Sequence, residues 1–152
     1  MQRALVAIDD TDTHRRLLAD AAEFAQNGAA ELVVLAWTTP DAAEESNDAI
    51  AWVEEMEGTT YEETDATAMT RKFAEEFTAD VVGDIDADVD IETAITDEAD
   101  LDDEILSTAE RLGCDHVFIV GRKRSPTGKA IFGDVAQRVL LNFDGPVTVL
   151  ME

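Results

Sequence analysis

The sequence predicts a single-domain α/β protein: a Rossmann-like, three-layer sandwich with a parallel sheet between helices. Short apolar runs alternate with segments of helical period, which is the pattern of a parallel sheet covered on both faces. The 152 residues suit one domain with a substantial core. Since no internal repeat, low-complexity tract or linker interrupts residues 1–152, we expect one globular unit.

Five short runs are the predicted strands. They are residues 4–8 (ALVAI), 32–37 (LVVLAW), 88–95 (DVDIETAI), 116–120 (HVFIV) and 147–151 (VTVLM). In the run 88–95, Val89, Ile91 and Thr93 alternate with acidic residues. Strict alternation of this kind predicts an edge strand or a strand with one face in water.

Four segments between these runs have the apolar spacing of helices. The first can begin at a cap formed by Asp12 or Thr13 and ends before Gly28. The predicted buried faces are, in chain order, Leu17, Leu18, Ala21, Phe24 and Ala25; Ala66, Met69, Phe73 and Phe77; Leu101, Ile105, Ala109 and Leu112; and Val135, Val139 and Leu140. The third helix should end at Gly113, and the fourth should begin near Asp134.

The segment 38–63 is long for a connection in a compact domain. Its middle can form a short helix capped by Asp48, with Ile50, Trp52, Val53 and Met56 as apolar positions. Two interpretations stay open, namely a lid over one edge of the domain and a variable surface decoration.

The charge balance restricts the partners and the setting of the protein. With 35 acidic and 11 basic residues, the net charge of -24 opposes nucleic acid and anionic membrane surfaces. The apolar fraction of 45% favours a folded protein adapted to concentrated salt over an acidic disordered one. We expect a cytoplasmic protein of a halophile, because no leader and no membrane-length apolar segment is present. The one cysteine, Cys114, excludes an internal disulfide and is expected to be buried.

Candidate ligand residues follow three of the predicted strands. In an open parallel sheet, ligands bind beyond the carboxyl ends of the strands. Asp9 and Asp10 end the first strand, Trp37 ends the second, and Gly121 follows the fourth. The acidic pair also suits a response-regulator receiver, but no lysine lies near the end of the last strand, as a receiver would need.

The segment GRKRSPTGK, residues 121–129, gathers four of the bases of an acidic chain. Six residues separate Gly121 from Gly128, and Ala130 follows Lys129, so the spacing is not that of a P-loop. A flexible loop containing Gly121, Ser125 and Gly128 nevertheless leads into a helix near Asp134. Exposed backbone amides and the helix dipole favour an anion there.

Nearly the whole chain resembles the universal stress protein family. The similarity rests on ALVAIDDTD, AAEFAQNGAAELVVLAW and ILSTAERLGCDHVFIVGRKRSPTGKAIFGDVAQRVLLNFDGPVTVL. The resemblance implies a five-stranded parallel sheet of order 3-2-1-4-5, a homodimer formed through the last strand, and an adenine nucleotide, ATP or AMP, as the ligand. It implies stress response as the role. Since the sequence supplies no convincing nucleophile with its base, we predict no catalytic turnover.

The resemblance also implies the residues of the nucleotide site. Asp9 matches the acid that contacts ribose or adenine, Ala7 a wall residue, and Trp37 the residue whose backbone meets adenine. Gly121 and Gly133 match the first and last glycines of the phosphate loop, and Val120 and Val135 flank it. The family's second glycine is replaced by Arg124, the loop is one residue shorter, and Asp134 stands where the family has Ser or Thr.

Two roles for Asp134 stay open. It can cap the last helix, or it can hold a divalent cation such as Mg²⁺ that bridges to phosphate while Arg122, Arg124 and Lys129 neutralise the remaining charge. Two alternatives to a nucleotide-binding module also remain. One is a family member that has lost ATP binding and acts through protein contacts; the other is a slow Mg-dependent ATP hydrolase. His14 and His116 have no metal-ligand spacing and are expected to be structural or solvated.

Overall fold

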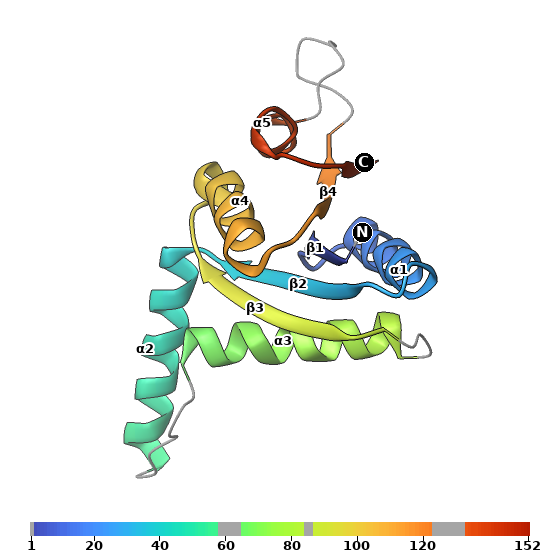
Figure 1. Ribbon diagram of the computed structural model, residues 1–152. Helices are drawn as coiled ribbons and strands as arrows, with labels where there is room; N and C mark the ends of the chain where they lie inside the picture. The colour runs from blue at the N-terminus through green and yellow to red at the C-terminus, as the bar shows by residue number, and fades with distance from the viewer. Residues whose placement is uncertain (1, 58–64, 84–86, 123–132) are drawn as a thin grey trace.

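The computed structural model describes residues 2–57, 65–83, 87–122 and 133–152. A five-stranded parallel sheet of order β3-β2-β1-β4-β5 forms its centre (Figure 1), so the predicted fold class is confirmed. The strands are β1 (Arg3–Ala7), β2 (Glu31–Thr38), β3 (Val89–Ile95), β4 (His116–Gly121) and β5 (Val147–Met151). Each lies on one of the five predicted runs.

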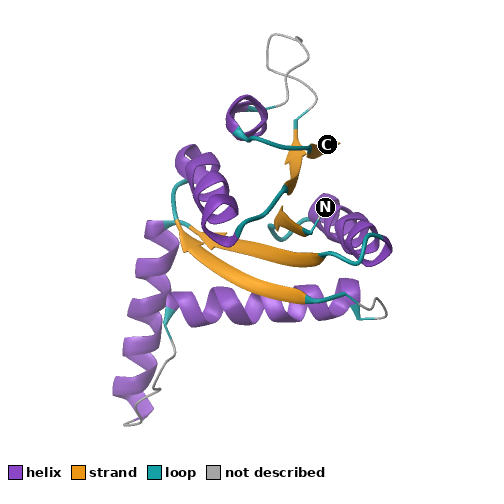
Figure 2. Ribbon diagram, viewed as in Figure 1, coloured by secondary structure: helices purple, strands orange, loops and turns teal. Residues whose placement is uncertain are grey.

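Helices cover both faces of the sheet, as Figure 2 shows. They are α1 (Asp12–Asn27), α2 (Pro40–Glu57), α3 (Ala66–Val82), the short 3-10 helix η1 (Glu98–Asp100), α4 (Leu101–Leu112) and α5 (Asp134–Asn142). α1 and α3 pack on one face, in a core layer that includes Leu18 and Phe77. α4 and α5 pack on the other face, in a layer that includes Ile105 and Val139.

Burial follows the position of each strand in the sheet. β1 and β2 are almost entirely buried, because they have a neighbour on each side and a helix layer above and below. β3 and β5 form the two edges and are mostly half-exposed, in agreement with the alternation in residues 88–95. None of the described helices is long and apolar enough to cross a membrane.

The helix ends have identifiable local causes. Thr11, rather than the expected Asp12 or Thr13, caps α1, because its Oγ1 accepts a hydrogen bond from the His14 amide at 3.1 Å. α4 ends at Gly113, which adopts the left-handed conformation with φ of 66°. This conformation carries no steric cost for glycine, so Gly113 stops the helix where the sequence predicted.

Some expectations about the helices were wrong. α2 begins at Pro40 and not at Asp48, because Thr39 Oγ1 accepts from the Ala42 amide and so caps the earlier start. Three residues predicted on buried faces are substantially exposed: Phe24 (47%), Met69 (47%) and Leu140 (38%). In Figure 1, α2 extends away from the sheet, and its Trp52 and Met56 are exposed.

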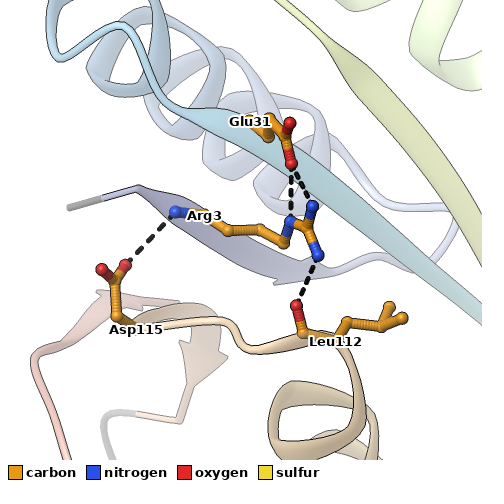
Figure 3. A network of polar contacts seen from close by, with 4 residues as sticks. All are labelled: Arg3, Glu31, Leu112 and Asp115. Carbon is orange, nitrogen blue, oxygen red and sulfur yellow. Dashed lines mark hydrogen bonds and ion pairs between the residues drawn. The ribbon is translucent and has the colours of Figure 1, made fainter.

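A polar network links the amino-terminal ends of the strands, on the side of the sheet opposite their carboxyl ends (Figure 3). The Arg3 guanidinium pairs with Glu31 on β2 and donates to the Leu112 carbonyl at the end of α4 at 2.5 Å. Asp115 accepts from the amides of Gln2 and Arg3, and the Gln2 bond is the main reason that the pKa of Asp115 lies below its usual value. The network joins β1, β2, α4 and the start of β4.

Two residues near the start of β4 are buried, and both have perturbed pKa values. Burial raises the pKa of the Cys114 thiol to about 11, and Cys114 is buried as expected. His116 stacks on Phe118 with a centroid distance of 4.4 Å, and its Nε2 lies 2.8 Å from Thr148 Oγ1. Burial lowers the pKa of His116, so the imidazole is neutral near pH 7. These contacts give His116 a structural role.

Candidate functional site

A cavity of about 600 Å³ lies at the carboxyl ends of the central strands. Seven of the residues predicted to bind a ligand line it: Ala7, Asp9, Trp37, Val120, Gly133, Asp134 and Val135. They come from the ends of β1, β2 and β4 and from the start of α5. These segments are far apart in sequence, and the parallel sheet brings them to the same rim because all its strands point the same way.

The remaining predicted site residues do not line this cavity in the described part of the chain. Gly121 is buried as the last residue of β4, where its carbonyl accepts from the Glu152 amide at 2.9 Å. Arg124, Ser125 and Gly128 lie outside the described residues.

The β1–α1 connection supplies three polar residues to the cavity. Asp9, Thr11 and His14 all line it. Because Thr11 takes the capping role, the Asp9 carboxylate is not needed as a helix cap. Among the residues that the structure describes, the adjacent Asp10 amide is the one donor to its Oδ1, at 2.8 Å. The unused acceptor capacity of Asp9 suits the hydroxyl groups of a ribose.

His14, which was expected to be structural or solvated, lines the cavity. Its Nδ1 lies 2.6 Å from Thr11 Oγ1, which fixes the ring beside the cavity. Burial lowers the pKa of His14 more than the nearby charge of Asp9 raises it. The imidazole is therefore neutral near pH 7 and can donate or accept a hydrogen bond.

Gly133 and Asp134 line the end of the cavity at the start of α5. Gly133 precedes α5 with φ of 88°, and the described atoms nearest to a Cβ there belong to the Arg122 side chain and amide, at 3.7 Å. The backbone conformation, rather than space, therefore requires glycine. Gly133 occupies the capping position of α5 and Asp134 is the first residue of the helix, so the first of the two roles left open for Asp134, the helix cap, was wrong. Its exposed carboxylate stands at the positive end of the helix dipole.

Two arginines span the side of the cavity near η1. Arg122 pairs with Glu98 at 3.1 Å, and both side chains are exposed. Arg138 on α5 donates to the Ala99 carbonyl at 2.7 Å and to Asp102 Oδ1 at 3.2 Å. Asp102, near the start of α4, is buried, whereas Arg138 is half-exposed. The two contacts of Arg138 hold η1 and the start of α4 against α5.

The described lining is mixed in charge. Acidic Asp9, Glu98, Asp134 and Glu152 face basic Arg122 and Arg138. Over the described ranges, no three His, Cys, Asp or Glu side chains are grouped as a metal site requires.

Glu98, Arg138 and Glu152 also line the cavity, but sequence reasoning did not assign these residues to the site. No motif marked them, because their places depend on how η1, α5 and the residue after β5 pack around the strand ends. His14 carried a readable signal, since it follows the acidic turn after the first strand by one helical turn.

Comparison with known proteins identifies the relatives of this chain. A model of the universal stress protein family matches residues 1–150. The structure of a universal stress protein from Archaeoglobus fulgidus is similar, with 26% identity, a TM-score of 0.64 and coverage of 98% of both chains. UspA from Lactobacillus plantarum has a TM-score of 0.67 at 18% identity, over 98% of this chain and 97% of that one.

A further similar structure is the Archaeoglobus fulgidus universal stress protein in complex with dAMP. It has 19% identity and a TM-score of 0.61, and the match covers 98% of this chain and 97% of that one. At this identity the likeness shows the shared fold. No curated protein sequence matches the chain.

Proposed function

The chain belongs to the universal stress protein family, and we propose that it is a non-catalytic stress-response module that binds an adenine nucleotide, ATP or AMP. The single observation that carries the proposal is the cavity at the strand ends. Asp9, Trp37 and Gly133, three positions implied by the family's nucleotide site, line it together. Its volume of about 600 Å³ lies within the range of small-molecule sites.

The walls of the cavity suit the parts of such a nucleotide. Trp37, Val135 and Ala7 offer apolar surface to a base, and Asp9 offers carboxylate oxygens to ribose hydroxyls. Arg122 lies beside Gly133, where the phosphates would lie. Structures of two similar proteins, one with dAMP and one with cAMP, support the choice of an adenine nucleotide.

The proposal is tested by measuring AMP and ATP binding by calorimetry in concentrated KCl, with and without Mg²⁺. Asp9→Asn is expected to weaken binding, and Ala99→Phe, which puts a ring into the cavity from its rim, is expected to abolish it. Ala51→Phe makes the same change at an exposed position of α2 that does not line the cavity, so it should bind normally. No binding by the unchanged protein would favour a member that has lost its nucleotide and acts through protein contacts.

One observation favours a second candidate, a slow Mg-dependent ATP hydrolase. The neutral His14 imidazole lies in the cavity and can accept a proton from an attacking water, while Asp9 or Asp134 holds magnesium. Multiple-turnover phosphate release that disappears in His14→Gln would support hydrolysis. Release that survives in Asp9→Ala/Asp134→Ala would count against it.

The assembly and the setting belong to the same proposal. We expect a homodimer through β5, because this strand is a sheet edge whose Val147, Val149 and Met151 are only partly buried. Val149→Arg should give a monomer in light scattering. The charge of -24 suits a cytoplasmic protein of a halophile, so unfolding at low KCl that is reversed at high KCl is expected.

A further inference from the structure

A second, smaller cavity adjoins the first on the other side of Asp9 and Trp37. Its volume is about 260 Å³, and it lies between the ends of β1 and β2, the first half of α2 and the start of α3. Asp9 and Trp37 line both cavities, whereas Asp10, Met69 and Phe73 line only the smaller one. The nucleotide site leaves this space without a role.

The start of α3 is fixed beside this cavity by capping contacts. The Ala66 amide donates to Asn47 Oδ1 on α2 at 2.9 Å, and the Ala68 amide donates to Asp65 Oδ1 at 2.9 Å. Thr11 caps α1 in the same way. Because side-chain oxygens already satisfy these amides, the helix ends offer less to an anion than uncapped ends would.

The walls combine carboxylates with aromatic and thioether surface. Asp9 and Asp10 are exposed at one end, and Trp37, Met69 and Phe73 provide the apolar surface. Met69 is 47% exposed, which leaves a large apolar side chain open to a ligand. In the described ranges, no Lys or Arg lines this cavity, in contrast to the larger one.

From this charge and surface we propose that the smaller cavity binds a small organic cation, an ammonium group on an apolar or aromatic body. The ammonium lies beside Asp9 and Asp10, where both carboxylates attract it. The body of the ligand packs against Met69 and Phe73. A volume of about 260 Å³ limits the ligand to one ring or a short chain.

The test uses phenethylammonium chloride, titrated into the full-length protein carrying ¹³C-methyl methionine. Of the four methionines, Met69 lines the cavity and Met56 is an exposed residue of α2 that does not. A saturable shift of the Met69 methyl signal, with Met56 unchanged, is expected. The neutral 2-phenylethanol and the ring-free ethylammonium should each bind roughly tenfold more weakly, since each lacks one of the two attractions.

Two variants that each add one lysine, inside and outside the smaller cavity, test the role of charge. Met69→Lys puts a cation beside the ammonium and should weaken phenethylammonium binding by roughly tenfold or more. Met56→Lys makes the same change in net charge away from both cavities and should leave the affinity unchanged. Equal weakening in the two variants would show a general counterion effect and would overturn the proposal. So would equal binding of 2-phenylethanol.

The source of the cation is distinguished by one further ligand. Nα-acetyl-lysine amide presents the side chain that a protein partner would offer, and it is expected to bind more weakly than phenethylammonium because it lacks a ring. Tighter binding of this lysine derivative would overturn the assignment to a small molecule. The ammonium end shares Asp9 with the proposed nucleotide site, whereas Met69 and Phe73 line the smaller cavity and not the larger one. The Met69 signal therefore reports on the smaller cavity whether or not a nucleotide binds.

Discussion

Replacing Arg138 with Gln is expected to lower the free energy of unfolding by about 2 kcal/mol. The guanidinium donates to Asp102 Oδ1 and to the Ala99 carbonyl, so the change removes two charge-assisted hydrogen bonds. The Asp102 side chain is only 8% exposed and would be left without this partner. Breaking a fully buried pair costs about 3–5 kcal/mol, and the value is reduced here because water reaches the half-exposed Arg138.

The matched control is the pair of Arg111 with Glu92, which has the same 3.2 Å separation. Its carboxylate is 29% exposed, so Arg111→Gln should cost only about 0.5 kcal/mol. For a chain of this size, thermal unfolding at constant KCl should show a fall in Tm of roughly 4–8 °C for Arg138→Gln and about 2 °C or less for Arg111→Gln.

Equal losses in the two variants would refute the argument that burial of the carboxylate sets the cost. A second variant separates the stranded charge from the lost contact. Asp102→Asn in the Arg138→Gln background removes the buried charge while it keeps the side-chain shape, and should restore about 1 kcal/mol. No recovery would mean that the packing of Arg138 against η1, rather than its charge, stabilises this side of the cavity.

Three further predictions concern single residues. Asp134→Ser should raise AMP affinity by roughly tenfold in calorimetry, because it removes an anion from the phosphate end; a fall in Mg-dependent ATP affinity would instead favour a cation bridge. Gly113→Ala should lower the unfolding free energy in urea by about 1 kcal/mol, since φ of 66° strains alanine, and an unchanged midpoint would contradict this. Burial holds the pKa of His116 below 6.5, so the unfolded state takes up the proton first and stability falls as pH falls through that value. His116→Phe should make the free energy of unfolding less dependent on pH as pH falls through 6.5, whereas an unchanged dependence would refute this cause.

Much of the fold could be predicted because local and tertiary preferences agree. The buried central strands are apolar on both faces, and the alternation in residues 88–95 marks an edge. Gly113 stops α4 through its own backbone conformation. The start of α2 was predicted at Asp48, eight residues after the observed start at Pro40, because only the apolar spacing was considered. Thr39 followed by Pro40 is a recognisable helix start, with Thr39 as the cap.

The site residues that could be predicted from topology are those that follow a strand. Residues that follow a strand, such as Asp9 and Trp37, have a position set by the topology and could be assigned to the rim. Arg138 and Glu98 enter the cavity through the packing of α5 and η1, which leaves no mark in the local sequence. Exposure of Phe24 was missed for a similar reason: its ring packs edge-on against His116 and Phe118 at the margin of the helix layer.

Because Cys114 is buried, its reaction with a thiol reagent can report local unfolding around the start of β4. With a pKa of about 11, only about one thiol in ten thousand is ionised at pH 7, and the sulfur is covered in the folded chain. A thiol reagent can therefore label the residue at an appreciable rate only when the start of β4 separates from its neighbours. Because the chain has a single cysteine, the labelling rate follows that one event. Nucleotides or salts that tighten the sheet would be detected by slower labelling, without any added probe.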